Sequence, residues 1–217
     1  MQPIFKSETL FKPKIMKKIL FAAAFAIISG SAFSQTFMHG AGITVIGSTT
    51  GQGSNSDIGF GEGFTYFPRF NFVETEALSV SVGIPLVVGI SATTGTTRDQ
   101  YGYTYDNTSV GFVLNAPLIV NLNMGRGSTK ENTKKFGYFV GAGFGFHHGD
   151  FLSDMYDPNT GTYVDSYSSN TFGPAANAGI RLGVGRKHKN IEIRFSYMKG
   201  INENKPNIGG VACSFNF

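Results

Sequence analysis

Residues 78–90 alternate between two kinds of side chain along their whole length. Every second residue from Leu78 to Ile90 is a large aliphatic, while the residues between them begin with Ser79, Ser81 and Gly83. A repeat of two residues is the signature of a β-strand, because successive side chains of a strand point to opposite faces. We therefore predict a long strand with one apolar face and one small or polar face.

The same alternation recurs in seven further segments. These predicted strands cover residues 37–47, 60–73, 110–122, 138–146, 172–184, 191–197 and 210–217. Most exceed the roughly five or six residues usual for strands of soluble sheets. A strand that crosses a bilayer at a tilt needs about 9–11 residues, so these lengths indicate strands of a membrane protein.

The two faces differ in the way that a membrane barrel requires. The apolar face is uniform and ends in aromatic residues, whereas the other face carries Gly, Ser, Asn and a few charges. In lipid every backbone polar group must be paired within the protein, so only a closed sheet can span the bilayer. The sequence predicts an all-β fold, an eight-stranded antiparallel up-and-down transmembrane β-barrel, which is the smallest class of such barrels.

Four prolines fall inside the predicted strands. They are Pro68, Pro85, Pro117 and Pro174. Because proline has no N–H to donate to a strand ladder, we expect bulges or local breaks at these positions. The sequences around Pro85 and Pro117 resemble each other, and no longer internal repeat is evident.

The connections between the predicted strands alternate in length, as they do in membrane barrels. The longer polar ones, which we predict to face the cell exterior, are residues 48–58, 93–108 and 149–170, with the shorter 202–207. The short or basic ones, which we predict to be periplasmic, are residues 74–77, 125–135 and 186–190. Residues 125–135 are long for that side. A cluster of turn-forming residues at 157–161 predicts that the connection around it projects as a hairpin.

The amino terminus has the pattern of an export signal. A basic stretch begins at Met16, a run of ten apolar residues follows at 19–28, and the small residues Ala32 and Ser34 fit a cleavage site. The apolar run is too short for a membrane helix, which takes about 20 residues. We predict translation from Met16 and cleavage after Ser34. This divides the chain into a leader at residues 1–34 and a barrel domain at residues 35–217.

Composition and charge exclude several classes of protein. Hydrophobic residues make up 41% of the chain and charged residues only 15%, which is unlike a disordered protein. The single cysteine excludes a disulfide framework. The formal net charge of +4 comes from lysines in the leader, so the predicted barrel has no basic patch of the kind that nucleic acid requires.

Four charged residues fall on the inward face of the predicted strands. They are Arg69, Arg181, Glu192 and Arg194. Charges inside a narrow barrel are costly unless they are paired, and eight strands enclose little more than side chains. The group is either a structural network that fills the lumen or a gate for an ion or solute.

Chemistry beyond that network finds little support in the sequence. The adjacent His147 and His148 point to opposite faces of a strand, and no histidine or cysteine pattern has the spacing of a zinc site. No Gly-x-Ser-x-Gly motif is present. We therefore predict no metal, no cofactor and no catalytic residues.

Several segments of the chain resemble a known group of proteins. They are the leader, the strands around Pro85 and Pro117, the strand around residues 141–146 and the terminal residues 214–217. They are similar to small outer-membrane β-barrels of Gram-negative bacteria, in particular the PorT-like and OmpA-like barrel domains of Bacteroidota. The resemblance covers about residues 35–217. It implies a place in the outer membrane, in contact with its lipids and lipopolysaccharide. Phe215 and Phe217 are similar to the terminal signal that the barrel-assembly machinery reads in that group.

The sequence thus predicts a non-enzymatic outer-membrane barrel with a structural or surface-interaction role through its extracellular loops. One alternative is a narrow pore or an accessory component of a transport or secretion apparatus. A second is a lipid-modifying barrel enzyme, and a third is a soluble secreted β protein whose apolar face lines a cavity. The sequence does not identify a surface ligand.

Overall fold

The computed structural model describes residues 36–50, 57–98, 102–150, 155–157, 162–164, 168–185, 189–201 and 205–217. The predicted start at Met16 and the predicted cleavage after Ser34 lie outside these residues. Within the described ranges, no helix is long and apolar enough to cross a membrane.

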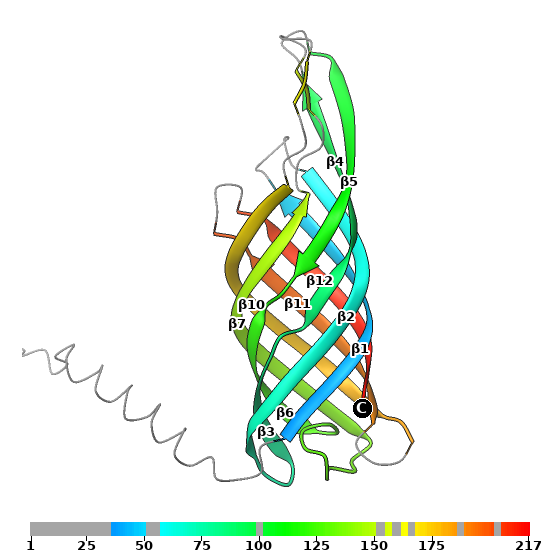
Figure 1. Ribbon diagram of the computed structural model, residues 1–217, viewed down its shortest axis with the longest axis vertical. Coiled ribbons are helices and arrows are strands. Elements are labelled where there is room, and N and C mark those ends of the chain that lie inside the picture. The colour runs from blue at the N-terminus through cyan, green and yellow to red at the C-terminus, as the bar shows by residue number, and fades with distance from the viewer. Residues whose placement is uncertain are drawn as a thin grey trace, which may run out of the picture.

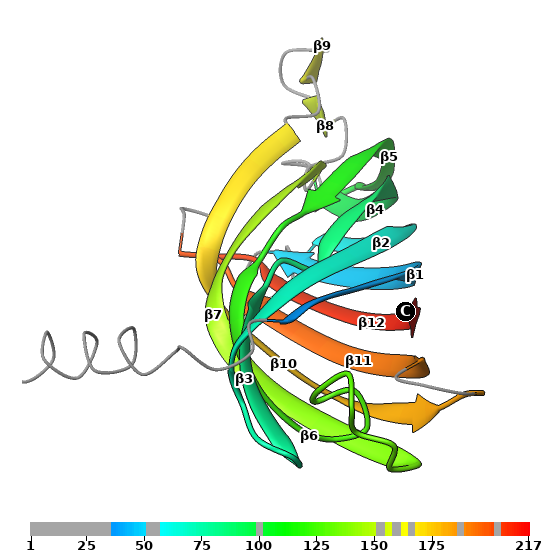
Figure 2. The ribbon, with the colours of Figure 1, turned by 60° about the horizontal axis from the view of Figure 1, so that its bottom comes forward.

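The described chain is made of antiparallel β-strands. Their bounds are β1 Thr36–Thr50, β2 Asp57–Glu74, β3 Leu78–Gly83, β4 Leu86–Arg98, β5 Thr104–Asn115, β6 Leu118–Gly125, β7 Phe136–Asp150, β8 Met155–Asp157, β9 Thr162–Val164, β10 Ser168–Gly183, β11 Asn190–Lys199 and β12 Asn207–Asn216. All except β8 and β9 belong to one sheet, whose strands wind at a common tilt around one axis (Figures 1 and 2).

The sheet closes on itself. β1 pairs with both β2 and β12, and the order continues from β12 through β11 and β10 to β7. Between β7 and β2, the wall is formed by β5 and β4 toward one end and by β6 and β3 toward the other. Because β3 with β4 and β5 with β6 are halves of two interrupted strands, the ring has eight members. The prediction of an eight-stranded antiparallel barrel is confirmed.

Two facing prolines cause both interruptions. The pairs Gly83↔Ile119 and Val87↔Asn115 flank the breaks in a single register, which places Pro85 opposite Pro117. The neighbouring N–H groups of Ile84 and Ala116 donate outward to the adjoining strands β2 and β7. Residues 85 and 117 therefore occupy positions whose N–H groups would hydrogen-bond across to the opposite strand. Proline has no N–H group, so both of these bonds are missing.

Pro68 and Pro174 leave their strands continuous, and the expected local break is confined to the ladder on one side of each strand. The carbonyl of Pro68 faces Ile84 at the β3–β4 break, where the missing N–H removes no regular ladder bond. Pro174 precedes the first pair of the β10–β11 ladder, Ala175↔Met198. In both cases the strand stays paired on its other side, where Pro68 is opposite His39 of β1 and Pro174 is opposite Phe144 of β7.

The two faces of the barrel wall have opposite character. Large apolar side chains point outward and remain exposed, among them Phe64 at 78%, Val110 at 72% and Phe136 at 68%. Inward positions such as Ser81 and Asn121 are fully buried. This is the predicted orientation, and it contradicts the alternative of a soluble barrel with an apolar lining and a polar exterior.

The two ends of the barrel differ. Thr36 and Phe217 lie at one end, which we call the terminal end (Figure 1). At the opposite end, the hairpin end, β4 pairs with β2 only as far as Thr94 but stays paired with β5 up to Arg98. The predicted loop at residues 93–108 is therefore largely strand, because the β4–β5 hairpin continues beyond the wall. The predicted hairpin within residues 149–170 is confirmed by the pairing of β8 with β9.

Candidate functional site

The charged residues predicted to face the lumen lie together. Arg181 on β10 is opposite Glu192 on β11, and its Nε donates to Glu192 Oε2 at 2.7 Å. Arg194, two residues further along β11, donates to the other carboxylate oxygen. All three side chains are buried. One carboxylate thus balances two guanidinium groups.

Arg69 on β2 joins the cluster through neutral groups. Its Nη1 donates to Asn123 Oδ1 at 3.0 Å, and Arg181 Nη1 donates to the same oxygen at 3.0 Å. Both arginines also donate to the carbonyl of Gly127. Because these acceptors carry no charge, the four predicted residues keep an excess of positive charge inside the barrel.

Aromatic rings position two of the guanidinium groups. The Cζ atom of Arg194 lies 3.7 Å from the ring centroid of Phe67, and that of Arg181 lies 4.4 Å from the centroid of Phe139. Both rings are buried on the inner face. Attraction between a cation and an aromatic face is strongest where water is excluded, so the rings restrain the arginines toward the carboxylate of Glu192.

The turn between β6 and β7 fills the mouth of the barrel at the terminal end. We call this turn, residues 125–135, the plug. Its side chains Arg126, Ser128 and Asn132 are buried. Gly127 has a φ of 69°, a conformation that residues with a Cβ rarely adopt. A Cβ there would also lie only 2.8 Å from Asn190 Nδ2.

Hydrogen bonds tie the plug to strands on several sides. The carbonyl of Ser128 accepts from Asn71 Nδ2 at 2.8 Å and from Ser79 Oγ at 2.6 Å. Arg126 Nη2 donates to the carbonyl of Lys189 at 2.9 Å, beyond the end of β10. The role of the plug is not evident from the sequence, where its length for a periplasmic turn is the one signal.

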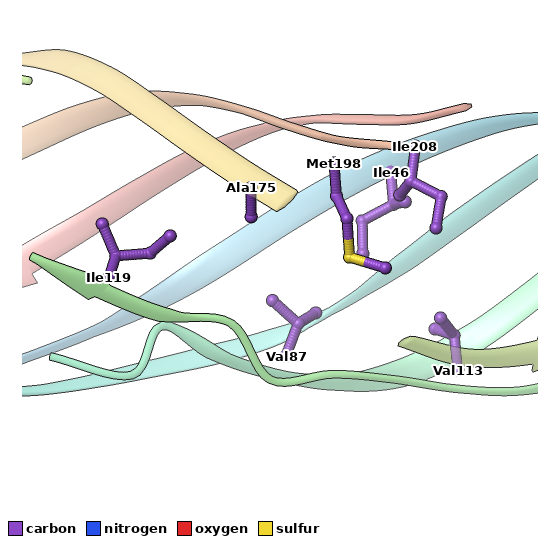
Figure 3. Close-up of a cluster of buried hydrophobic side chains, with 7 residues drawn as sticks. All are labelled: Ile46, Val87, Val113, Ile119, Ala175, Met198 and Ile208. Atoms are coloured by element: carbon purple, nitrogen blue, oxygen red, sulfur yellow. The ribbon is translucent and has the colours of Figure 1, made fainter. Parts of the chain in front are cut away.

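An apolar layer crosses the lumen on the hairpin side of the arginine cluster. It consists of Ile46, Val87, Val113, Ile119, Ala175, Met198 and Ile208. Side chains from opposite walls point toward one another across the interior (Figure 3). The prediction that the inner face carries only small, polar or charged residues is wrong at this level. The sequence already contained this information, because Val87, Val113 and Ile119 occupy inward-facing positions of their predicted strands.

The histidines do not assemble into a reactive group. His147 points inward, 3.3 Å from Asn115 Oδ1, and His148 lies on the outer face, 2.9 Å from Asn170 Oδ1. His188 lies outside the described residues. Within the ranges that the structure covers, no three His, Cys, Asp or Glu side chains are grouped so that they could hold a metal ion.

The predicted assembly residues lie on the outer face of the terminal end. Phe215 and Phe217 are 39% and 42% exposed. The N–H of Phe217 donates to the carbonyl of His39 at 3.1 Å. The ring centroids of Phe217 and His39 lie 4.3 Å apart. The terminal aromatic is therefore fixed against β1, and its recognition by an assembly machinery stays a prediction.

No protein-family model matches the sequence, and no curated protein matches it significantly. Among solved structures, the chain is similar to the attachment invasion locus protein Ail of Yersinia pestis, with a TM-score of 0.46 over 84% of this chain and 98% of Ail, at 10% identity. It is also similar to Neisserial surface protein A, with a TM-score of 0.42 over 84% of this chain and 97% of that one, at 10% identity. Outer membrane protein OprG of Pseudomonas aeruginosa gives a TM-score of 0.42 over 83% and 95% of the two chains, at 10% identity.

Proposed function

We propose that this protein is a non-enzymatic outer-membrane barrel that acts at the cell surface through its hairpins and conducts no solute. The observation that carries this proposal is the filled lumen. The plug occupies the terminal mouth, the arginine cluster lies behind it, and the apolar layer follows. Two successive layers of buried side chains leave the extracellular elements as the part of the protein able to meet a partner.

The apolar outer face supports placement in a membrane. Soluble proteins rarely expose continuous apolar surface larger than a few hundred Å², and here exposed apolar side chains occur on all the strands of the ring. The predicted leader directs export, and the outer membrane is where exported barrels reside. On this proposal the outer face contacts lipid, and the hairpin end contacts lipopolysaccharide.

The β4–β5 hairpin supports a surface role. Beyond the pair Ile58↔Thr94, the two strands continue together as far as Arg98 and Thr104. Four further residues of strand add roughly 13 Å at about 3.3 Å each. Tyr103, near the tip, is 68% exposed, and tyrosine is enriched in protein interfaces.

Orientation is tested first, by labelling intact cells. Single cysteines at Tyr103→Cys and Glu76→Cys, each in a Cys213→Ser background, place a thiol at opposite ends of the barrel. A membrane-impermeant maleimide should label Tyr103→Cys on intact cells and Glu76→Cys only after lysis. Labelling of Glu76→Cys alone on intact cells would reverse the proposed orientation.

The surface role is tested by shortening the hairpin. Thr94 and Thr108 are register partners, so joining them through an Asn-Gly turn removes residues 95–107 and keeps the wall paired. Cells carrying the short form should lose the cell–cell or cell–surface adhesion that the full-length protein confers. Equal adhesion by both forms, or a steady current through the full-length protein in a planar bilayer, would overturn the proposal.

A further inference from the structure

Three buried polar atoms without a hydrogen-bond partner surround one small cavity in the lumen. They are Thr44 Oγ1, Thr65 Oγ1 and Arg194 Nε. Each of these residues is only 4% exposed, and all three line a cavity of about 30 Å³. Buried polar groups in folded proteins are nearly always hydrogen-bonded. Three such groups lining one space therefore point to an occupant that hydrogen-bonds to them, either a water molecule or an ion.

The strand register brings these groups together. Thr44 on β1 is opposite Ala212 on β12, and Ala212 is opposite Arg194 on β11. The small side chain of Ala212 leaves room between the two donors. Thr65 on β2 lines the same cavity. The three donors thus come from three different strands.

The proline pair and the apolar layer complete the walls. Pro85 and Pro117 both line the cavity, so it lies at the height where the two strands are interrupted. Ile46 and Ile208 also line it and belong to the apolar layer. The cavity therefore lies between that layer and the arginine cluster, among buried side chains where electrostatic interactions are stronger than in water.

The chemistry of the site selects a small anion. Two hydroxyl groups and a guanidinium N–H can all donate. In the cluster next to the cavity, Glu192 pairs with Arg181 and Arg194, and Arg69 is bonded to neutral groups. The cavity is small, about 30 Å³, so a small anion is the occupant that fits it best.

We propose that the lumen binds one monatomic anion, chloride under natural conditions. Thr44 Oγ1, Thr65 Oγ1 and Arg194 Nε hold it, and it neutralises part of the positive charge that Glu192 leaves unbalanced. The anion lies beside the Arg194–Glu192 pair, so its binding stabilises the folded barrel, and the stabilisation grows with the anion concentration.

The test uses the full barrel, folded in detergent and titrated with sodium bromide against sodium gluconate at constant ionic strength. The folded-to-unfolded ratio should rise in proportion to 1 + [bromide]/Kd, that is, by about eleven-fold at a bromide concentration ten times the dissociation constant. The variant Thr44→Val with Thr65→Val should show an apparent affinity at least ten-fold weaker. Ser91→Ala, which removes another unpartnered hydroxyl that does not line the cavity, should respond like the unmodified protein.

Anomalous diffraction from bromide-soaked crystals of the unmodified protein gives an independent measurement, should the double variant fail to fold. A bromide peak within hydrogen-bond distance of Thr44 Oγ1 and Arg194 Nε is expected. A cavity that holds water without an anomalous peak would overturn the proposal. So would a folded-to-unfolded ratio that does not change when bromide replaces gluconate, or a bromide response that the double variant retains in full.

Discussion

Glu192 is the residue on which the interior charge balance depends. Its two oxygens accept from Arg181 and Arg194, and Asn216 Nδ2 donates to Oε2 at 3.1 Å. The side chain is fully buried, so water cannot replace a lost partner. Removing one member of a buried charge group leaves the others uncompensated, which costs far more than losing a surface ion pair.

Glu192→Gln should therefore lower the free energy of unfolding by about 3–5 kcal/mol. The measurement is urea unfolding of the barrel in lipid vesicles. The matched control is Glu62→Gln, which makes the same chemical change on an exposed carboxylate. If the two variants were equally stable, Glu192 would not be balancing the arginines.

A substitution at Glu62 tests whether the outer face of the barrel contacts lipid or water. It lies on that face between Val45 of β1 and Ile90 of β4, both of them exposed apolar residues. A carboxylate on a lipid-facing surface is destabilising by an amount that depends on its depth. In a soluble protein the same carboxylate would be favourably hydrated.

Glu62→Leu should raise the free energy of unfolding by about 1 kcal/mol in lipid vesicles. Glu76→Leu, in the exposed turn between β2 and β3, should give no gain. A loss of stability for Glu62→Leu would show that the carboxylate has a polar partner and that this part of the wall does not face lipid.

The alternation of side chains along the strands was enough to place the charged residues on the inner face, but not to identify their hydrogen-bond partners. Arg69, Arg181, Glu192 and Arg194 share one face because each occupies an inward position. The carbonyl of Gly127 enters the cluster through the backbone path of a turn, which depends on a positive φ and on contacts from distant strands. No local pattern in the sequence encodes that path.

At the scale of elements, the facing prolines divide two strands at one height. Their positions opposite each other remove two adjacent ladder bonds at once, while the flanking pairs keep one register. The sequence predicted an interruption at each proline separately. That the two coincide follows from the pairing register, which also explains why Pro68 and Pro174 are tolerated within continuous strands.

Pro85→Ala combined with Pro117→Ala should join β3 to β4 and β5 to β6. Each new N–H can donate to the carbonyl of the residue opposite, so residues 85 and 117 should both show slowed amide hydrogen exchange. Each single variant should show one protected amide. Rapid exchange at both positions of the double variant would mean that the backbone is bent there for another reason.

At the scale of the whole molecule, the plug and the apolar layer are two barriers in series. Replacing residues 127–134 by a two-residue turn removes the first barrier, and Met198→Gly opens the second, since Met198 is buried within the layer. Either change alone should leave the current through a planar bilayer at background. The combination should conduct, and current through a single variant would show that the remaining barrier does not close the lumen by itself.

The closed ring predicts resistance to denaturation by detergent. Every strand has a partner on each side, so unfolding has no free edge in the described sheet from which to begin. Unboiled protein should migrate differently from boiled protein in a detergent gel. Identical migration, with recovery in the soluble fraction, would contradict both the closed barrel and its placement in a membrane.

The architecture was predictable because a period of two over eight long segments leaves few alternatives. The apolar layer and the length of the β4–β5 hairpin were harder to predict. Inward apolar residues such as Val87 are few along any one strand, and they form a layer only when the tilt of the barrel brings them to one height. Residues 93–108 read as loop because their polar side chains suit water on both faces.

The position of the plug in the chain has a consequence for stability. It lies between the fourth and fifth strands of the ring, yet its carbonyls are bonded by Asn71 and Ser79 from the first half of the chain and by Arg181 from the second. β2 and β3 reach the plug through the pairing of β3 with β6, and β10 reaches it through β7. The plug therefore links strands from the two halves of the chain inside the ring, so a change in its sequence should affect the stability of both halves together.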